Sequence, residues 1–167
     1  MWSKVVKHLG NHPERLAVAK KLIENGLNIK DGKIYLNEIE IPFIGIARAA
    51  NVDRRTVVRT IKDIESNPEL KVLFRNLRSA GHSLREVARH IGLGVIEITP
   101  TDAKIPGILA GAATILSNRG ISIRQALVDD PELSPEPHLT LIAERKIPGD
   151  VVSEVLKLKG VLKVSVY

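Results

Sequence analysis

The sequence predicts an α+β protein, with a mainly helical first half and a second half that mixes strands and helices. Apolar residues follow helical spacing up to Gly92, and alternate with a period of two in several later segments. Charge divides at the same place: residues 1–92 carry 17 Lys+Arg and 10 Asp+Glu, whereas residues 93–167 carry 8 and 9. We therefore expect two domains, 1–92 and 93–167, of which only the first is suited to a polyanionic partner.

The first half is expected to contain several helices and one hairpin. Apolar residues at helical spacing predict a helix over 13–25 that ends at Gly26, and Asp31-Gly32 between two short apolar runs predicts a two-residue hairpin turn. Further helices are expected over 42–50, 54–66 and 69–79. Ser83 and Glu86 have the spacing of a capping box, which predicts another helix that ends at Gly92.

The second half is expected to follow the order βαββαβ. The pattern predicts a strand over 94–100, a helix over 106–118, two strands over 121–128 and 138–144 that form a hairpin, a helix from Pro148, and a final strand over 161–167. In the final strand Leu162, Val164 and Val166 are expected to face the same way. This order implies an antiparallel sheet with both helices on one face, the ferredoxin-like sandwich.

Several classes of protein and site are not expected. The chain has no apolar run of about 18 residues, no cysteine, and no secretory signal at its N-terminus, so we expect a cytoplasmic protein without a membrane span or disulfides. No carboxylate pair, activated nucleophile or phosphate loop stands out, so neither an enzyme nor a cofactor is expected. His8 and His12 have the spacing of a metal pair, but Gly10 and Pro13 interrupt the helix that this pair would need.

Residues 46–65 meet the requirements of a helix-turn-helix. Ala47 is small where the two helices would come closest, Asn51 tolerates the left-handed conformation of the turn, Val52 supplies an apolar plug, and Asp53 can cap the next helix. The inward stripe of that helix would then be Val57, Ile61 and Ile64. The same stretch could also be an ordinary pair of packed helices.

This stretch resembles the helix-turn-helix of bacterial and archaeal transcription regulators, whose pattern is matched by Ala47, Asn51, Val52, Asp53, Thr56, Val57 and Arg59. The resemblance implies that Arg54 and Arg55 lie nearest the base edges of a major groove, and that Thr56, Arg59 and Lys62 hold phosphates. Lys30 and Lys33 on the hairpin would serve as a small wing, although the usual wing follows the recognition helix.

The stretch "DAKIPGILAGAATILSNRGISI" suggests a small-molecule site. Pro106 at the first position of a helix, followed by Gly107, would leave bare N–H groups that can receive a carboxylate. Within the βαββαβ order, the stretch resembles the ACT domain, an amino-acid-sensing module that usually pairs and binds its ligand at the pair's interface. The resemblance implies a ligand site at Asp102, Ala103, Lys104, Ile105, Pro106, Gly107, Ile108, Asn118 and Ile121.

Some amino-acid-binding ACT domains carry His-x-Asn-x-Pro-Gly in this loop, whereas this chain has Asp102-x-Lys104-x-Pro106-Gly107. Our hypothesis is that Asp102 meets the ammonium of an amino acid and Lys104 its carboxylate. The alternative is that both are solvated loop charges.

The whole order resembles archaeal regulators of amino-acid metabolism that carry a C-terminal ACT domain. It implies a transcription regulator that forms a homodimer or higher homo-oligomer through its ACT domains, binds double-stranded DNA and responds to a free amino acid. The alternative is a regulatory subunit that binds no DNA and controls a biosynthetic enzyme by protein contact. RNA binding is less favoured, because Trp2, Tyr35, Phe43, Phe74 and Tyr167 form no evident stacking platform.

Overall fold

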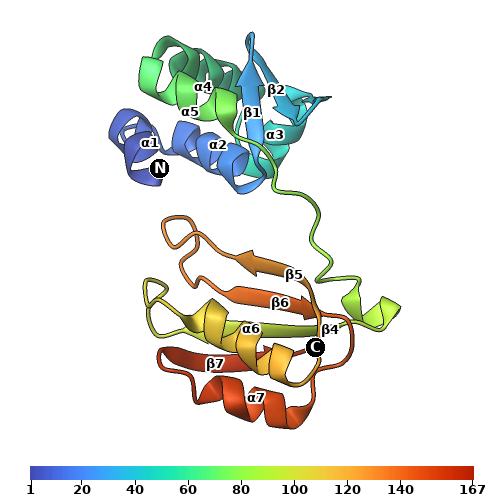
Figure 1. Cartoon of the computed structure of the whole chain (residues 1–167). Helices are drawn as coiled ribbons and strands as arrows, with labels where there is room; N and C mark the ends of the chain where they lie inside the picture. The colour runs from blue at the N-terminus through green and yellow to red at the C-terminus, as the bar shows by residue number, and fades with distance from the viewer. The chain divides into compact units, whose positions relative to one another are not determined.

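The computed structural model describes residues 1–167 and divides into two compact units, Met1–Gly81 and His82–Tyr167. Helices and two antiparallel sheets make it an α+β protein (Figure 1). The units part after Gly81, so residues 82–92 belong to the second unit, whereas the sequence had suggested a boundary after Gly92. The first unit carries 15 Lys+Arg and 9 Asp+Glu, and the second carries 10 of each, so the excess positive charge lies in the first unit.

The helices of the chain are short. None of them combines the length and the apolar character that crossing a lipid bilayer requires.

The first unit packs five helices with a three-stranded antiparallel sheet. Its elements are α1 (Trp2–Leu9), α2 (Pro13–Glu24), β1 (Leu27–Lys30), β2 (Lys33–Leu36), β3 (Ile39–Ile41), α3 (Phe43–Ala50), α4 (Arg54–Ser66) and α5 (Pro68–Asn76). The predicted hairpin is confirmed, since Asp31 and Gly32 have φ of 51° and 74°, which a tight primed turn requires. The sequence reading missed α1 and β3. It also extended α5 too far, because Leu77 is already in an extended conformation.

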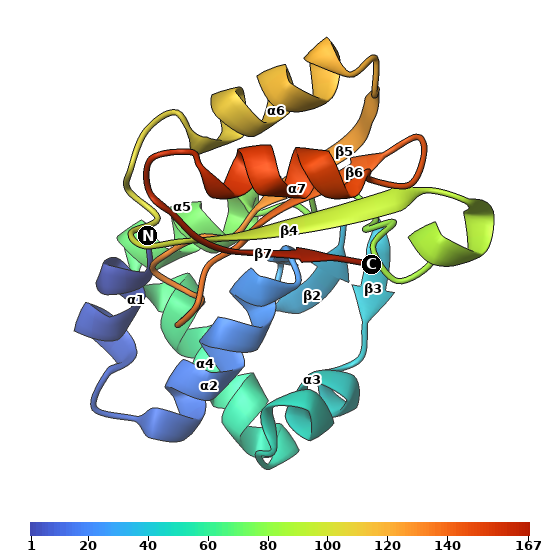
Figure 2. The same ribbon diagram turned by 90° about the horizontal axis from the view of Figure 1, so that it is seen from below.

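The second unit contains one four-stranded antiparallel sheet. Its elements are β4 (Gly94–Pro100), α6 (Ile108–Asn118), β5 (Ile123–Val128), β6 (Leu139–Ala143), α7 (Gly149–Leu156) and β7 (Val161–Val166), and the strands lie in the order β5-β6-β4-β7. Both helices lie on the same face of the sheet (Figure 2). Ile96, Ile98 and Leu141 point to that face and are fully buried against residues of both helices.

Two local expectations in the second unit were wrong. Pro106 lies outside α6, which begins at Ile108 after Gly107 has taken a φ of 93°. The ladder between β4 and β7 shifts register at Thr99/Pro100, so Pro100 pairs with Val161. This irregularity turns Leu162 outward, where it is 64% exposed, and puts Val161 and Val164 against the core instead.

Residues 83–92 do not form the expected helix. Only the short 3-10 turn η1 (Ala88–Ile91) is regular. The Ser83 hydroxyl oxygen accepts from the Arg85 N–H at 3.3 Å, and the Ala88 N–H donates to the Leu84 carbonyl oxygen at 2.8 Å, but this single turn does not continue as an α-helix. Ala88 and Leu93 are buried with Val95 and Ile142 in a second small cluster. Because side chains alternate along a strand, Val95 points away from Ile96, so this cluster lies on the sheet face opposite α6 and α7.

Candidate functional site

The turn between α3 and α4 has the geometry predicted for a helix-turn-helix. Asn51 ends α3 in the left-handed conformation, with φ 52° and ψ 50°, and its N–H donates to the carbonyl oxygen of Arg48 at 3.2 Å. The Val52 N–H donates to the Ala47 carbonyl oxygen at 2.9 Å, which is how helix ends of this type satisfy their last carbonyls. Ala47 is 2% exposed, as the close approach of the two helices requires.

The start of α4 and its inward stripe are also confirmed. Asp53 is extended, and its Oδ1 accepts from the Arg55 backbone N–H at 2.6 Å, which caps the helix. Val57, Ile61 and Ile64 are buried in the first unit. With this stripe directed to the core, the opposite side of α4 is fixed as its outer surface.

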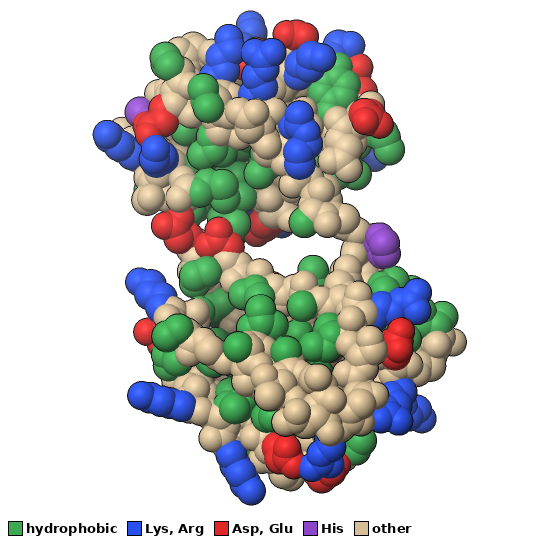
Figure 3. Space-filling view, viewed as in Figure 1, with side chains coloured by type: hydrophobic (Ala, Val, Ile, Leu, Met, Phe, Trp, Pro, Cys, Tyr) green, Lys and Arg blue, Asp and Glu red, His purple; other side chains and the backbone are tan.

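That outer surface carries four cations that lack acidic partners. Arg54, Arg55, Arg59 and Lys62 are all exposed, and none of their side chains forms an ion pair or hydrogen bond in the structure. Lys and Arg side chains gather along one side of the first unit in Figure 3. Thr56 differs from the other predicted contact residues, since it is half-buried and its hydroxyl donates to Glu14 Oε2 at 3.2 Å. Free cations along the exposed face of a helix can contact phosphates and base edges.

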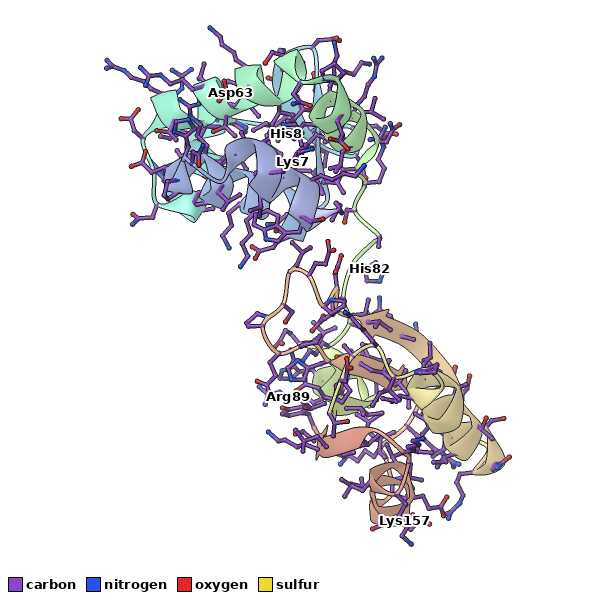
Figure 4. The ribbon with its side chains drawn as sticks, turned by 90° about the vertical axis from the view of Figure 1, so that its left-hand side faces the viewer. Lys7, His8, Asp63, His82, Arg89 and Lys157 are labelled. Atoms are coloured by element: carbon purple, nitrogen blue, oxygen red, sulfur yellow. The ribbon has the colours of Figure 1, made fainter.

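Helix α2 fixes the position of α4, through contacts that the sequence reading did not include. Arg15 Nη1 lies 2.6 Å from Asp63 Oδ2, near the C-terminal end of α4. Glu14 accepts from the Thr56 hydroxyl near the N-terminal end of α4. Two adjacent residues of α2 therefore contact α4 near both of its ends. Figure 4 shows Asp63 on α4 and His8 on α1 within this unit. In the sequence, the apolar spacing of α2 indicates a helix, but it does not show that this helix packs against α4.

The hairpin offers one free lysine rather than two. Lys33 Nζ lies 2.8 Å from Glu40 Oε2 on β3, and this hydrogen bond to Glu40 raises the pKa of Lys33. Lys30 is exposed and makes no ion pair. Because β3 was not predicted from the sequence, the ion pair between Lys33 and Glu40 was not predicted either. Lys30 is therefore the hairpin residue that remains available to a phosphate.

The left-handed turn at Asn51 can be tested by substitution. We expect Asn51→Ala to lower the free energy of unfolding by about 1 kcal/mol, because a Cβ without a local polar group is unfavourable in this conformation, and Asn51→Gly to change it by less than about 0.5 kcal/mol. Denaturant unfolding followed by the fluorescence of Trp2 measures both. Asn25→Ala is the matched control, since Asn25 also ends a helix but at φ −103°. Equal costs for alanine and glycine at position 51 would contradict this reading.

The second unit contains a cavity of about 220 Å³ beside the N-terminus of α6. Four of the predicted ligand-binding residues line it: Ala103, Ile105, Gly107 and Ile108. Asp102, Lys104 and Pro106 belong to the same loop but do not line the cavity. Asn118 and Ile121 lie at the other end of α6, where Ile121 is 3% exposed and packs in the core. The remaining walls come mainly from apolar residues of β4, α6, β5 and β6.

The carboxylate of Asp102 has a partner within its own loop. Asp102 Oδ1 accepts from the Lys104 backbone N–H at 2.9 Å, and the Asp102 carbonyl oxygen accepts from the Ile105 N–H at 3.1 Å. The Thr101 N–H donates to the Gly160 carbonyl oxygen at 2.8 Å, which fastens the loop to the chain before β7. Asp102 therefore shapes the loop through its own backbone neighbours.

Asp129 and His138 supply the charged and titratable side chains of the cavity wall, and the sequence reading had not selected them for this role. They face each other where β5 ends and β6 begins: the Asp129 N–H donates to the His138 carbonyl oxygen, and the His138 N–H donates to Asp129 Oδ2, both at 3.0 Å. His138 Nδ1 lies 3.6 Å from the same carboxylate oxygen. The only sequence signal was their position on either side of a turn-rich stretch, "DPELSPEP".

No family model and no curated protein sequence matches this chain. Among solved structures, the chain is similar to the leucine response regulatory protein LrpA of Mycobacterium tuberculosis, with 14% identity over 93% of this chain and 90% of that one and a TM-score of 0.28. It is also similar to E. coli AsnC, with 10% identity over 93% of this chain and 88% of that one and a TM-score of 0.25.

Proposed function

We propose that this chain is a non-enzymatic transcription regulator that binds duplex DNA through α3 and α4 and responds to a free amino acid bound by its second unit. The observation that carries the proposal is the outer face of α4, where Arg54, Arg55, Arg59 and Lys62 are exposed without acidic partners. In a helix-turn-helix the second helix enters the major groove, and arginines at its start reach base edges. The strand order of the second unit supports its assignment as a ferredoxin-like ACT module.

The salt dependence of binding tests the DNA-binding part. If Arg59, Lys62 and Lys30 neutralise phosphates, the logarithm of the association constant should fall with the logarithm of salt concentration with a slope of about −3. Fluorescence anisotropy with duplexes selected from a random pool measures this slope. If the basic face of the first unit instead docks on an enzyme, we expect no selected duplex and a shallower slope with the protein partner.

The cavity supports the sensing part and the class of effector. Its walls are mostly aliphatic, which suits an aliphatic side chain, and Asp129 offers a carboxylate for an ammonium group. The first N–H groups of α6 receive no side-chain cap, and Gly107 leaves open space in front of them, so they can donate to a carboxylate. We therefore propose an aliphatic amino acid with its ammonium group at Asp129. This replaces Asp102 in our first hypothesis, because Asp102 does not line the cavity.

Asp129 and Asp102 make a matched pair of variants. We expect Asp129→Asn to weaken binding of L-leucine, L-isoleucine or L-valine by about tenfold or more, because hydrogen bonds to charged groups contribute about 1.5–3 kcal/mol. Asp102→Asn should leave the affinity unchanged. Titration calorimetry measures both, after a thermal-shift screen of the twenty amino acids has selected the tightest ligand. The opposite pattern would restore Asp102 as the ammonium partner.

We also propose that the second units pair. Pairing would set the distance between two α4 helices, which must match half-sites one or more helical turns apart on the DNA. An effector could alter DNA affinity only through different affinities for the two arrangements, an effect of about 1–3 kcal/mol in typical cases. Sedimentation equilibrium tests the pairing, and a monomer at micromolar concentration would rule it out.

A further inference from the structure

Gln125 on β5 holds the segment that enters the second unit from the first. Its side-chain Nε2 donates to the His82 carbonyl oxygen at 2.5 Å, and its Oε1 accepts from the Leu84 N–H at 2.9 Å. One side-chain amide thus donates to one backbone group and accepts from another in a segment that is otherwise irregular. A neighbouring β-strand would satisfy the same two groups. We call this pair of hydrogen bonds the Gln125 clasp. Figure 4 shows His82 and Arg89 on the segment that the clasp fastens.

A β-bulge directs Gln125 to this segment. Along the β5–β6 ladder Ile123 pairs with Ala143, but Gln125 pairs with Ile142, so Arg124 is the extra residue. In a regular strand Ile123 and Gln125 would point to the same face. The bulge keeps Ile123 with the core under α6 and α7 and turns Gln125 to the opposite face, beside Ile142.

Apolar and ionic contacts complete the attachment of the segment. Ala88 and Leu93 are buried against Val95 and Ile142, with Leu84 packed beside them. Arg85 Nη2 lies 2.6 Å from Glu97 Oε2, whose side chain is only 11% exposed. The backbone just before this segment is also held, within the first unit. Ser79 lies so close to Gly26 that a Cβ on Gly26 would meet the Ser79 backbone at 2.6 Å. Only Ala80 and Gly81 lie between these two held segments, and the Gly81 carbonyl oxygen accepts from the Ser79 hydroxyl at 3.5 Å.

The strand that carries the clasp also lines the cavity. Val128 and Asp129 lie three and four residues beyond Gln125 and form part of the cavity wall. β5 is an edge strand, with β6 as its only neighbour, and its bulge is the point of least regular hydrogen bonding. A strand restrained on one side can shift along its length with less loss of hydrogen bonds than a central strand.

We propose that β5 couples the cavity to the entering segment, and that Gln125 is the positioning residue through which the coupling acts. A group that fills the cavity displaces the Val128 and Asp129 end of β5, and the shift reaches Gln125 through the strand and loosens the clasp. Residues 82–84 then become more mobile, next to the connecting residues Ala80 and Gly81. The identity of the ligand rests on the proposed function, but the clasp and its link to the cavity do not.

Hydrogen exchange at the Leu84 amide tests the clasp. This N–H donates to Gln125 Oε1, so Gln125→Ala should raise its exchange rate by about tenfold, the effect of losing one hydrogen bond. Gln125→Glu retains an acceptor for the Leu84 N–H but loses the donor to His82, and should preserve most of the protection. Exchange at Ile142 and Leu141 reports whether the sheet itself is intact. Unchanged exchange at Leu84 in Gln125→Ala would overturn the proposal.

Filling the cavity from the side away from β5 tests the coupling without a ligand. Ala103→Trp, or Leu109→Trp in case the first variant does not fold, should raise Leu84 exchange by about fivefold or more, in the usual range of coupling between sites. Ala110→Trp is the matched control, since Ala110 is exposed on α6 and does not line the cavity. Equal Leu84 exchange in the filled and control variants would overturn the coupling.

Titration with L-leucine separates this inference from the proposed function. If resonances of Asp129 and His138 shift and those of Leu84 and the Gln125 side chain shift with them, the coupling is supported. If only the cavity resonances shift, sensing stands and the coupling is wrong. If no amino acid shifts any of them, amino-acid sensing is wrong, and the cavity-filling variants decide the coupling.

Discussion

The double variant Arg54→Ala/Arg55→Ala is expected to lose about 2 to 6 kcal/mol of binding free energy to its preferred duplex, because each arginine paired with guanine contributes about 1–3 kcal/mol of discrimination. Both residues lie in the first turn of α4, exposed and free of acidic partners. The loss should be largest for the selected sequence and smaller for random duplex, since random DNA is bound chiefly through phosphates. Competition anisotropy with the two duplexes measures the difference.

Controls distinguish base reading from simple loss of charge. Arg124→Ala/Lys159→Ala removes the same charge from exposed positions of the second unit, and should leave DNA affinity nearly unchanged. Lys62→Ala should weaken selected and random duplexes alike and reduce the salt slope by about 1. An equal loss in both double variants would show that DNA responds only to net charge, and would contradict α4 as the reading element.

Gly94→Ala is expected to cost about 3 kcal/mol in stability of the second unit, at the upper end of the range for added atoms in a packed site. A Cβ at Gly94 would meet the Arg145 carbonyl oxygen and would lie 3.0 Å from the Ile147 backbone nitrogen. These are backbone atoms, so no rotamer change can relieve the contact. Gly94 also pairs with Ala143 at the start of the central strand β4. Guanidinium unfolding followed by far-UV circular dichroism measures the loss.

Gly149→Ala is the matched control in the same unit. Gly149 is the first residue of α7, and a Cβ there would meet no atom within 4 Å. Alanine should therefore be neutral or stabilise by up to about 1 kcal/mol. Trp2, the only tryptophan, reports on the first unit, whose unfolding neither variant should change. A Gly94→Ala protein as stable as the wild type would mean that the chain near Arg145 does not lie against β4.

Local chemistry was sufficient to predict α3, α4 and the turn between them. Asn51 can enter the left-handed region at low cost, Asp53 caps the helix that follows it, and the spacing of Val57, Ile61 and Ile64 decides which side of α4 is buried. Each of these properties depends on a few consecutive residues. The exposure of Arg54, Arg55, Arg59 and Lys62 then follows without knowledge of the rest of the fold.

Contacts between distant residues could not be predicted in the same way. The helix expected at Ser83 failed because Gln125, about forty residues later, binds the backbone of His82 and Leu84, and because Ala88 and Leu93 are buried on the outer face of the sheet. The ion pair between Lys33 and Glu40 and the hydrogen bond from Thr56 to Glu14 could not be predicted either, because each joins two separate elements of the fold. Tertiary packing overrode local preference at each of these positions.

The sequence by itself determined the α+β class, the position of most helices and strands, the turn at Asn51 and the basic outer face of α4, because periodicity, capping and turn conformation act over a few residues. Only the tertiary structure decided where residues 82–92 pack, which loop residues line the cavity, and that Asp129 and His138 join them. It also decided the direction of Gln125, since a bulge on β5 reverses the alternation that the sequence pattern implies. These features depend on register and on side chains brought together by the sheet, which no local pattern encodes.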